Sequence, residues 1–277
     1  VLTVDANGDC GWEAAGGGPS TGQSYVLSKN DSGNLADSDE NVMAGYNAGS
    51  SLASGAEECT FFGWKAGEDV TTGDNNTCFG AKSGDSITTG VMNIAIGAQA
   101  LTQVTTQNYN VAIGTYSGGS GSQNICLGYQ AGNNQAGDHN FFAGWQTGGH
   151  GAGSGNTSSH YCIGIGYHAL NALTTGDYNV VLGSESGKNM TTASNCIVIG
   201  KDTHPSSNTV DNEITLGNNS ITKFRIPGIN FTIKDTTATD NYVLTVDSNG
   251  EAGWEAAAGA INSDDQYNVL GGTGAGN

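Results

Sequence analysis

Asn110-Val-Ala-Ile-Gly-Thr-Tyr-Ser-Gly118 decides the fold, because closely related stretches occur on both sides of it. One is Asn93-Ile-Ala-Ile-Gly-Ala-Gln-Ala-Leu101, and another is Asn179-Val-Val-Leu-Gly-Ser-Glu-Ser-Gly187. The glycine that ends each apolar triplet, here called the marker glycine, recurs at steps of 14 to 22 residues, most often 17. It stands at Gly45, Gly63, Gly80, Gly97, Gly114, Gly128, Gly144, Gly166, Gly183, Gly200 and Gly217. Such a period is typical of a repeat architecture, and it predicts about eleven coils over residues 41–220.

The composition favours an all-β solenoid. Gly accounts for 45 of 277 residues, Pro for only 3 and charged residues for 12%, while Asn, Ser and Thr are abundant. This is too polar for a helical bundle and too regular for a disordered chain. Because stacked strands lie about 4.8 Å apart, eleven coils predict a rod roughly 50 Å long.

The charge limits the partners. The formal net charge is −18, so the phosphates of a nucleic acid and an anionic membrane surface would both repel the chain. The sequence contains no run of 18 apolar residues, no signal peptide and no lipidation motif, and we therefore expect no membrane insertion.

The alternation of side chains along each short strand predicts which residues form the core. Residues one and three places before the marker glycine, such as Ile94 and Ile96, are apolar, and we expect them inside the coil. The residue between them is also mostly apolar, so the strand is expected to be buried on both faces. A coil of about 17 residues is too thin for that, and the middle residue is therefore expected to face sister chains, most simply in a homotrimer. This predicted interchain face includes Met43, Phe61, Ala95, Ala112, Phe142, Val181 and Val198.

Other positions of the coil are also informative. The residue three places after the marker glycine is never larger than Thr, which predicts a tight corner. Several coils continue to Thr-Thr-Gly, as at Thr88-Thr-Gly90, which predicts a second short strand and a turn. Four places before the marker glycine, a recurrent asparagine either forms a coil-to-coil amide ladder or is simply the turn residue before the strand. These asparagines are Asn41, Asn76, Asn93, Asn110, Asn124, Asn140 and Asn179.

The six cysteines lie far apart and form no Cys-x-x-Cys pair and no Cys/His cluster at zinc spacing. Five of them occupy repeat positions where other coils carry Asn or a small apolar residue. They are typical of small buried side chains and indicate folding in a reducing compartment, with no disulfides.

The flanks carry a second repeat. Val1-Leu-Thr-Val-Asp-Ala-Asn-Gly-Asp-Cys-Gly-Trp12 is a predicted β-hairpin, and Val243-Leu-Thr-Val-Asp-Ser-Asn-Gly-Glu-Ala-Gly-Trp254 repeats it with an offset of 242. The longest coil, around Thr147–His160, predicts a loop that bulges from one face. The predicted parts are a hairpin (1–16), a second hairpin and linker (17–40), the repeat array (41–220), a neck or cap (221–240), another hairpin (241–258), and a linker that begins a further array (259–277).

The units at 93–101 and 110–118 resemble the head repeats of trimeric autotransporter adhesins. The Thr-Thr-Gly spacers, the ending Asn212-Glu-Ile-Thr-Leu-Gly-Asn-Asn-Ser-Ile-Thr222 and the hairpins are similar to segments of bacteriophage and large-virus tail or surface fibres. The resemblance implies a left-handed parallel β-roll in which three chains lie side by side. It departs from the autotransporter heads in its longer unit, and neither their membrane anchor nor a self-cleaving chaperone domain is found.

Enzymatic and ligand-binding chemistry is weakly indicated. The acidic residues are scattered without a convergent pair, so no catalytic residue is predicted. The five histidines stand singly, and no metal site or cofactor is predicted. Asp5-Ala-Asn-Gly-Asp9 is better explained by a hairpin turn than by a calcium loop, because the bidentate Glu is missing. Five aromatic residues follow the marker glycine directly and either stack on glycans or seal the corners between coils or the chain interface. They are Tyr46, Trp64, Tyr129, Trp145 and Tyr167.

Together these observations predict a structural fibre protein of a virion, synthesised in the host cytoplasm and displayed on the particle surface. Its expected partners are itself, other virion proteins and a glycan or protein receptor of the host. One alternative is a bacterial trimeric surface adhesin or extracellular filament, which a secretion signal and an outer-membrane anchor would indicate. Another is a glycan-degrading tail spike, which release of reducing sugars would establish.

Overall fold

The computed structural model describes residues 2–4, 10–12, 41–53, 55–149, 158–225, 242–246 and 252–256 of the chain. The predicted second hairpin and linker (17–40), the terminal linker (259–277), most of the neck and the centre of the insertion (150–157) lie outside the described residues. The chain divides into two units, Val1–Thr222 and Lys223–Asn277. Every regular element in the described ranges is a β-strand.

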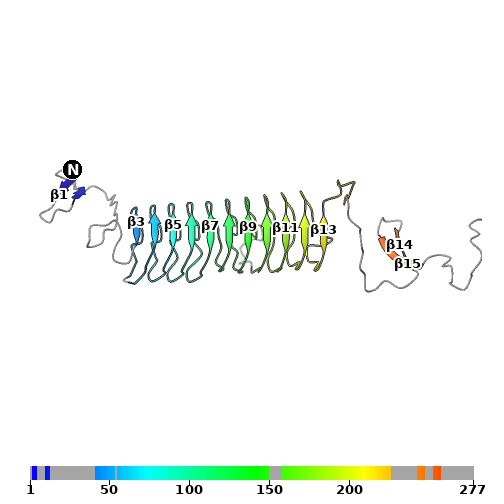
Figure 1. Ribbon diagram of the computed structural model, residues 1–277, viewed down its shortest axis with the longest axis horizontal. Helices are drawn as coiled ribbons and strands as arrows, with labels where there is room; N and C mark the ends of the chain where they lie inside the picture. The colour runs from blue at the N-terminus through cyan, green and yellow to red at the C-terminus, as the bar shows by residue number, and fades with distance from the viewer. Residues whose placement is uncertain are drawn as a thin grey trace, which may run out of the picture. The chain divides into compact units, whose positions relative to one another are not determined.

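The repeat array forms a parallel β-solenoid, as the sequence predicts. Its eleven strands form one sheet in the order β13 to β3, and each strand pairs with the strand of the next coil. Figure 1 shows β3 to β13 side by side in one row, with each coil returning through a loop. The strands are β3 (Val42–Ala44), β4 (Thr60–Phe62), β5 (Thr77–Phe79), β6 (Ile94–Ile96), β7 (Val111–Ile113), β8 (Ile125–Leu127), β9 (Phe141–Ala143), β10 (Ile163–Ile165), β11 (Val180–Leu182), β12 (Ile197–Ile199) and β13 (Ile214–Leu216).

The marker glycines allow the coils to stack closely. From Gly45 to Gly200 they have φ between 125° and 140°, a conformation that residues with a Cβ rarely adopt. A Cβ atom built on Gly63 would lie 2.5 Å from the carbonyl oxygen of Gly80 in the next coil. Any other residue here would therefore be strained and would also collide with its neighbour.

The predicted assignment of the two strand faces is wrong. The middle residues are fully buried within a single chain: Phe61, Ala95, Ala112, Phe142, Val181 and Val198 are each 0% exposed. Met43, in the first coil, is partly buried and packs against the same core. The flanking residues point outward instead, and Ile94 and Ile96 are 36% and 37% exposed. The residues predicted to lie between chains are therefore the core of each coil.

The physical reason for this reversal lies in the return half of the coil. It folds back beneath the strand and brings an apolar side chain into the interior, such as Val70, Ile87, Val104, Leu173 or Met190, all 0% exposed. These side chains join the middle residues in one core cluster. A thin coil has room for one side chain from each strand, and the single middle residue fits that space better than the pair of residues on the other face.

The return half contains no second strand in the described coils, which corrects the prediction for the Thr-Thr-Gly segments. Successive segments are nevertheless joined by hydrogen bonds. The main-chain N–H of Thr71 donates to the carbonyl of Thr88, and that of Thr88 donates to Thr105, each at 2.8 Å. The Thr71 and Thr88 hydroxyls donate to the same carbonyls at 3.1 Å. Coil-to-coil bonding therefore continues where the backbone is too bent to form a strand.

The predicted tight corner is confirmed. Ala66, Ser83, Ala100, Ser117 and Ala131 are each 0% exposed. The Ser83 hydroxyl donates to the carbonyl of Gly80 at 3.0 Å, and the equivalent Ser117 donates to Gly114 at 2.9 Å. A larger side chain would have no space between the stacked corners.

Two antiparallel strand pairs lie outside the array. β1 (Leu2–Val4) pairs with β2 (Cys10–Trp12), and Leu2 lies opposite Trp12. β14 (Tyr242–Val246) pairs with β15 (Ala252–Ala256), and Leu244 lies opposite Trp254. The two repeated sequences thus pair in the same register.

Candidate interaction surfaces

The outward side of the sheet carries an extended row of apolar side chains, here called the apolar face. It consists of the first and third residues of strands β3 to β13, two from each of eleven strands. Thr60 and Thr77 are the only polar residues among them, and none is charged. Eleven coils of three-residue strands cover about 50 Å by 10 Å, on the order of 500 Å². Monomeric proteins rarely expose a larger apolar patch, and such patches commonly mark interaction sites.

Exposure on the apolar face is greatest at Ile214 in β13, the last strand of the array. Ile197 and Ile199 are 37% and 39% exposed, and Ile214 and Leu216 reach 67% and 49%. In β4 and β5, Phe62 and Phe79 stack with ring centroids 5.8 Å apart. The register that stacks the marker glycines also aligns these side chains into two continuous columns. The face can therefore accept a straight, repetitive partner.

The five predicted glycan-stacking residues all lie at the surface, immediately after the apolar face. They are between 36% and 51% exposed: Tyr46 46%, Trp64 48%, Tyr129 36%, Trp145 51% and Tyr167 48%. They form two groups, since the three coils between Trp64 and Tyr129 carry Ala81, Ala98 and Thr115 at this position.

The two groups differ in charge. The Lys65 and Lys82 ammonium groups each lie 5.5 Å from the Trp64 ring centre. Lys65 also pairs with Glu68 at 2.9 Å, and a hydrogen bond from Lys65 lowers the pKa of the Glu68 carboxyl. In the second group, the rings of Tyr129 and Trp145 lie 4.6 Å apart at 37°, with uncharged neighbours.

A second aromatic row borders the other side of the apolar face, and the sequence reasoning missed it. It occupies the position five residues before the marker glycine. Its members are Tyr109, His139, Tyr161 and Tyr178, and their φ angles lie between 56° and 62°. The Tyr161 ring stacks on His139 at 4.7 Å and on Tyr178 at 5.1 Å. The recurrence of large side chains at this offset was the available signal. Both faces of the Tyr161 ring are therefore covered by neighbouring rings, while Tyr178 at the end of the stack is 59% exposed.

The recurrent asparagines form a buried hydrogen-bond ladder between coils. Asn93 Oδ1 accepts the main-chain N–H of Asn110 at 3.0 Å and its side-chain amide at 3.1 Å, and the amide of Asn93 donates to the carbonyl of Gln107 at 3.0 Å. Where the column contains cysteine, the thiol takes over the donor role: Cys59 Sγ donates to Gly73 O at 3.2 Å, and Cys162 Sγ to Gly176 O at 3.3 Å. Each ladder asparagine is at most 4% exposed.

A second side-chain ladder, here called the outer ladder, runs two residues before the asparagines, and the sequence reasoning also missed it. Asp138 Oδ1 accepts the main-chain N–H of Ser122 at 2.7 Å, His160 Nδ1 accepts that of Asp138 at 3.0 Å, and Asp177 Oδ1 accepts that of His160 at 2.7 Å. Here the acceptor belongs to the later coil, whereas in the asparagine ladder it belongs to the earlier one. Several scattered acids thus have a structural role.

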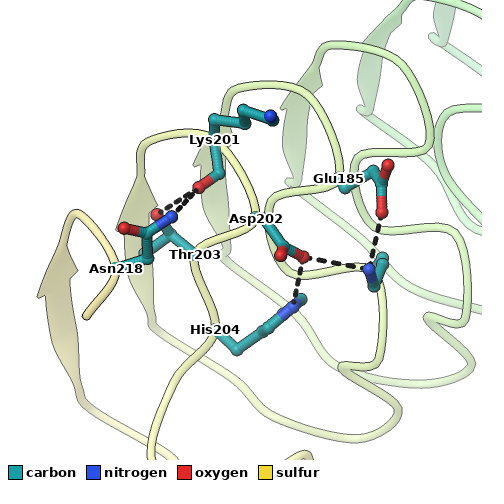
Figure 2. Close-up of polar contacts among 7 residues, drawn as sticks. Glu185, Lys201, Asp202, Thr203, His204 and Asn218 are labelled. Atoms are coloured by element: carbon teal, nitrogen blue, oxygen red, sulfur yellow. Dashed lines mark hydrogen bonds and ion pairs between the residues drawn. The ribbon is translucent and has the colours of Figure 1, made fainter. Parts of the chain in front are cut away.

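A polar cluster lies at the last coils of the array. Lys188 Nζ lies 2.6 Å from Glu185 Oε2 and 2.9 Å from Asp202 Oδ1, and His204 Nε2 lies 3.2 Å from the same Asp202 oxygen. Figure 2 shows Asp202 directed towards His204, and Asn218 directed towards the main chain of Lys201. The hydrogen bond from Lys188 is the main reason why the pKa of the Asp202 carboxyl is lowered.

This cluster borders an open pocket, which is also lined by Thr215 and Gly217. His204 Nδ1 is buried without a hydrogen-bond partner. No serine or threonine hydroxyl is hydrogen-bonded to His204 among the described residues, so the group lacks the arrangement of a nucleophile and its base. Its evident role is to tie successive corners together.

Other site types find no support in the described ranges. They contain no group of three or more His, Cys, Asp or Glu side chains placed to hold a metal ion. None of their elements is a helix of the length and hydropathy that would cross a membrane. Cys59, Cys78, Cys126, Cys162 and Cys196 are buried, as the sequence predicts. Burial raises the pKa of Cys126 to about 12 and that of Cys162 to about 11.

In comparisons with known proteins, no family model, curated protein or solved structure matches the chain.

Proposed function

We propose that this chain is a structural and adhesive fibre segment of a virion that assembles as a homotrimer through its apolar face. The observation that carries the proposal is the continuous row of uncharged side chains on all eleven parallel strands. Burial of this face in an interface would be favourable, because each Å² of apolar surface removed from water contributes roughly 25 cal/mol of free energy.

Another copy of the same chain is the occupant that fits the face best. Its stacked coils would present the same columns at the same spacing, so contacts would repeat along the full length. Three copies around an axis parallel to the stack would allow each chain to cover its neighbours in a closed assembly. The second aromatic row, which consists of Tyr109, His139, Tyr161 and Tyr178, would extend the contact on one side of the face, towards the roughly 800 Å² per partner that stable interfaces bury.

A fibre role also agrees with the energetics of the coils. Backbone hydrogen bonds, the asparagine ladder and the outer ladder all run along the stacking direction, which suits a protein that must stay rigid along one axis. The net charge of −18 would keep separate fibres apart in solution. The virion is proposed because the repeats and hairpins resemble those of viral fibres.

The mass of the native particle, measured by light scattering, tests the assembly. We expect three times the chain mass of 28.1 kDa. The double variant Ile96→Asp/Ile199→Asp should remain folded and give the mass of one chain, because each carboxylate would be desolvated in the interface. The matched control Thr89→Asp/Thr192→Asp places the same charges on exposed residues of the return half and should leave the mass unchanged.

A folded wild-type protein with the mass of one chain would overturn the assembly. The placement on a virion has its own test, which is mass spectrometry of purified particles from the source of the sequence. Peptides of this chain should be found in intact particles, and their presence only in host membranes or culture filaments would instead support a bacterial adhesin.

A further inference from the structure

We infer that the second group of corner aromatics is a binding surface for an uncharged, linear polysaccharide that lies along the solenoid axis. This inference rests on the adhesive role proposed above and names its ligand class. The surface consists of Tyr129, Trp145 and Tyr167, here called the corner row, and of Gln130, Gln146 and His168, here called the amide row. Both rows belong to the consecutive coils of β8, β9 and β10.

The corner row offers aromatic surface to a ligand. Its three side chains are 36%, 51% and 48% exposed, although large aromatic residues are usually buried for most of their area. The Tyr129 and Trp145 rings are tilted by 37°, so neither ring fully covers the other. The Tyr161 and Tyr178 rings of the other aromatic row are parallel within 2°, so each covers one face of the other.

The amide row places hydrogen-bonding groups next to these rings. His168 Nε2 lies 2.7 Å from Gln146 Oε1, and Gln146 Nε2 donates to Gln130 Oε1 at 2.8 Å. This chain of bonds fixes the side chains along the axis, and the amide nitrogen of Gln130 donates no hydrogen bond to another described residue. Asn171, next to the row, donates to the main-chain carbonyl of Gln146 at 3.1 Å. Ordered amides beside aromatic rings are suited to hydroxyl groups, which both donate and accept.

The surroundings determine which glycans fit. Between Asp85 and Asp177 the sequence contains only one Asp, Glu, Lys or Arg, which is Asp138. In the structure, Asp138 is engaged in the outer ladder. The coils of the corner row therefore contain no cation that would attract a sulfate or carboxylate, and the Lys188 ammonium group of the next coil is paired with Glu185 and Asp202. The net charge of −18 repels anions in general. An uncharged sugar chain meets no such penalty.

The other exposed aromatic group differs in this respect. Trp64 already holds the ammonium groups of Lys65 and Lys82 near its ring, and Glu68 lies beside them. Its ring is approached by two ammonium groups, whereas no cation is found over a ring of the corner row in the described residues. Trp64 therefore provides a control at the equivalent position of another coil.

The direction of the ligand follows from the repeat. Each of three consecutive coils contributes one ring and one amide or imidazole, and coils are spaced at about 4.8 Å. A linear chain of sugar units parallel to the axis would meet the same pair of groups at each step. A single sugar would contact only one or two coils and would bind more weakly.

Affinity electrophoresis through gels that contain soluble polysaccharide tests the inference on the intact protein. The probes are the neutral polymers mannan, glucan and xylan, with polygalacturonate as an acidic comparator. We expect at least one neutral polymer to retard the protein and polygalacturonate to have no effect. Trp145→Ala and Tyr129→Ala should each weaken the retardation about tenfold, whereas Trp64→Ala should not change it.

Light scattering of the same variants separates this inference from the proposed assembly. Trp145→Ala should keep the native mass, because the inference places the residue outside the chain interface. If none of the neutral polymers retards a protein of trimer mass, the polysaccharide surface is refuted while the fibre assembly stands. If Trp145→Ala loses the native mass, the corner row belongs to the interface and the inference is wrong.

Discussion

Asn93 Oδ1 accepts two hydrogen bonds from Asn110, which lies 17 residues further along the chain, at 3.0 Å from its main-chain nitrogen and 3.1 Å from its side-chain nitrogen. Both residues are at most 1% exposed. A buried amide that bridges two coils in this way satisfies polar groups that the strands alone would leave unpaired.

Removal of one asparagine from the ladder is expected to lower the stability of the folded chain. Asn93→Leu should lower the free energy of unfolding by about 2–3 kcal/mol, because it leaves a buried N–H and a buried carbonyl without partners. Asn93→Cys should cost less, since cysteine thiols donate to the equivalent carbonyl at Cys59 and Cys162. Urea denaturation at fixed protein concentration would measure both. Asn208→Leu, at an exposed asparagine outside the ladder, is the control, and an equal loss there would contradict the role of the ladder.

The corrected strand faces can be tested at two adjacent residues of β12. Val198 is 0% exposed and Ile199 is 39% exposed. Val198→Asp should abolish the folded solenoid, because an unpaired buried charge costs several kcal/mol. Ile199→Asp should keep the strand signal in circular dichroism and resist limited proteolysis. If Ile199→Asp unfolded the protein and Val198→Asp did not, Ile199 and not Val198 would belong to the core.

The marker glycines predict a difference between two alanine substitutions. Gly63→Ala should destabilise the protein by about 3 kcal/mol or more, since it combines a strained φ with a backbone collision. Gly55 also has a positive φ, 98°, but nothing lies within 4 Å of a Cβ at that position. Gly55→Ala should therefore cost only about 1 kcal/mol. Thermal denaturation of both variants would measure this difference. Similar melting temperatures would show that the backbone collision does not destabilise Gly63→Ala.

Buried thiols predict a loss of stability in alkaline solution. Burial raises the pKa of Cys126 from 9.0 to about 12, so the thiol stays protonated in the folded chain while the unfolded chain ionises. Its contribution is complete below pH 9.0 and is lost as the pH rises from 9.0 towards about 12. Urea denaturation at about pH 8 and about pH 10.5 should show the decrease.

A matched variant isolates this thiol. Cys126→Ala should lose less stability over the same pH range, because Ala112 occupies the equivalent position of the preceding coil without a titrating group. The folded wild-type protein should also react slowly with thiol reagents and quickly once unfolded. Fast modification of Cys126 in the folded protein would show that the thiol is accessible.

The sequence by itself determined the architecture of this protein. Three kinds of residue recur at fixed positions of the repeat: the marker glycine, the small corner residue and the asparagine of the ladder. They recur because similar coils impose the same steric requirements at every step. The period therefore predicted a β-solenoid and located the strands that the structure contains.

Only the tertiary structure decided which side of each strand is the core. Both sides of a strand such as Ile94–Ile96 are apolar, so alternation alone cannot separate the interior from the surface. The decision is made by the return half of the coil, which brings Val104 and its equivalents under the middle residue. The same closure exposes the apolar face, and the positive-φ corners place the aromatic rows beside it. These contacts join residues of different parts of the coil, and a pattern read along one strand does not contain them.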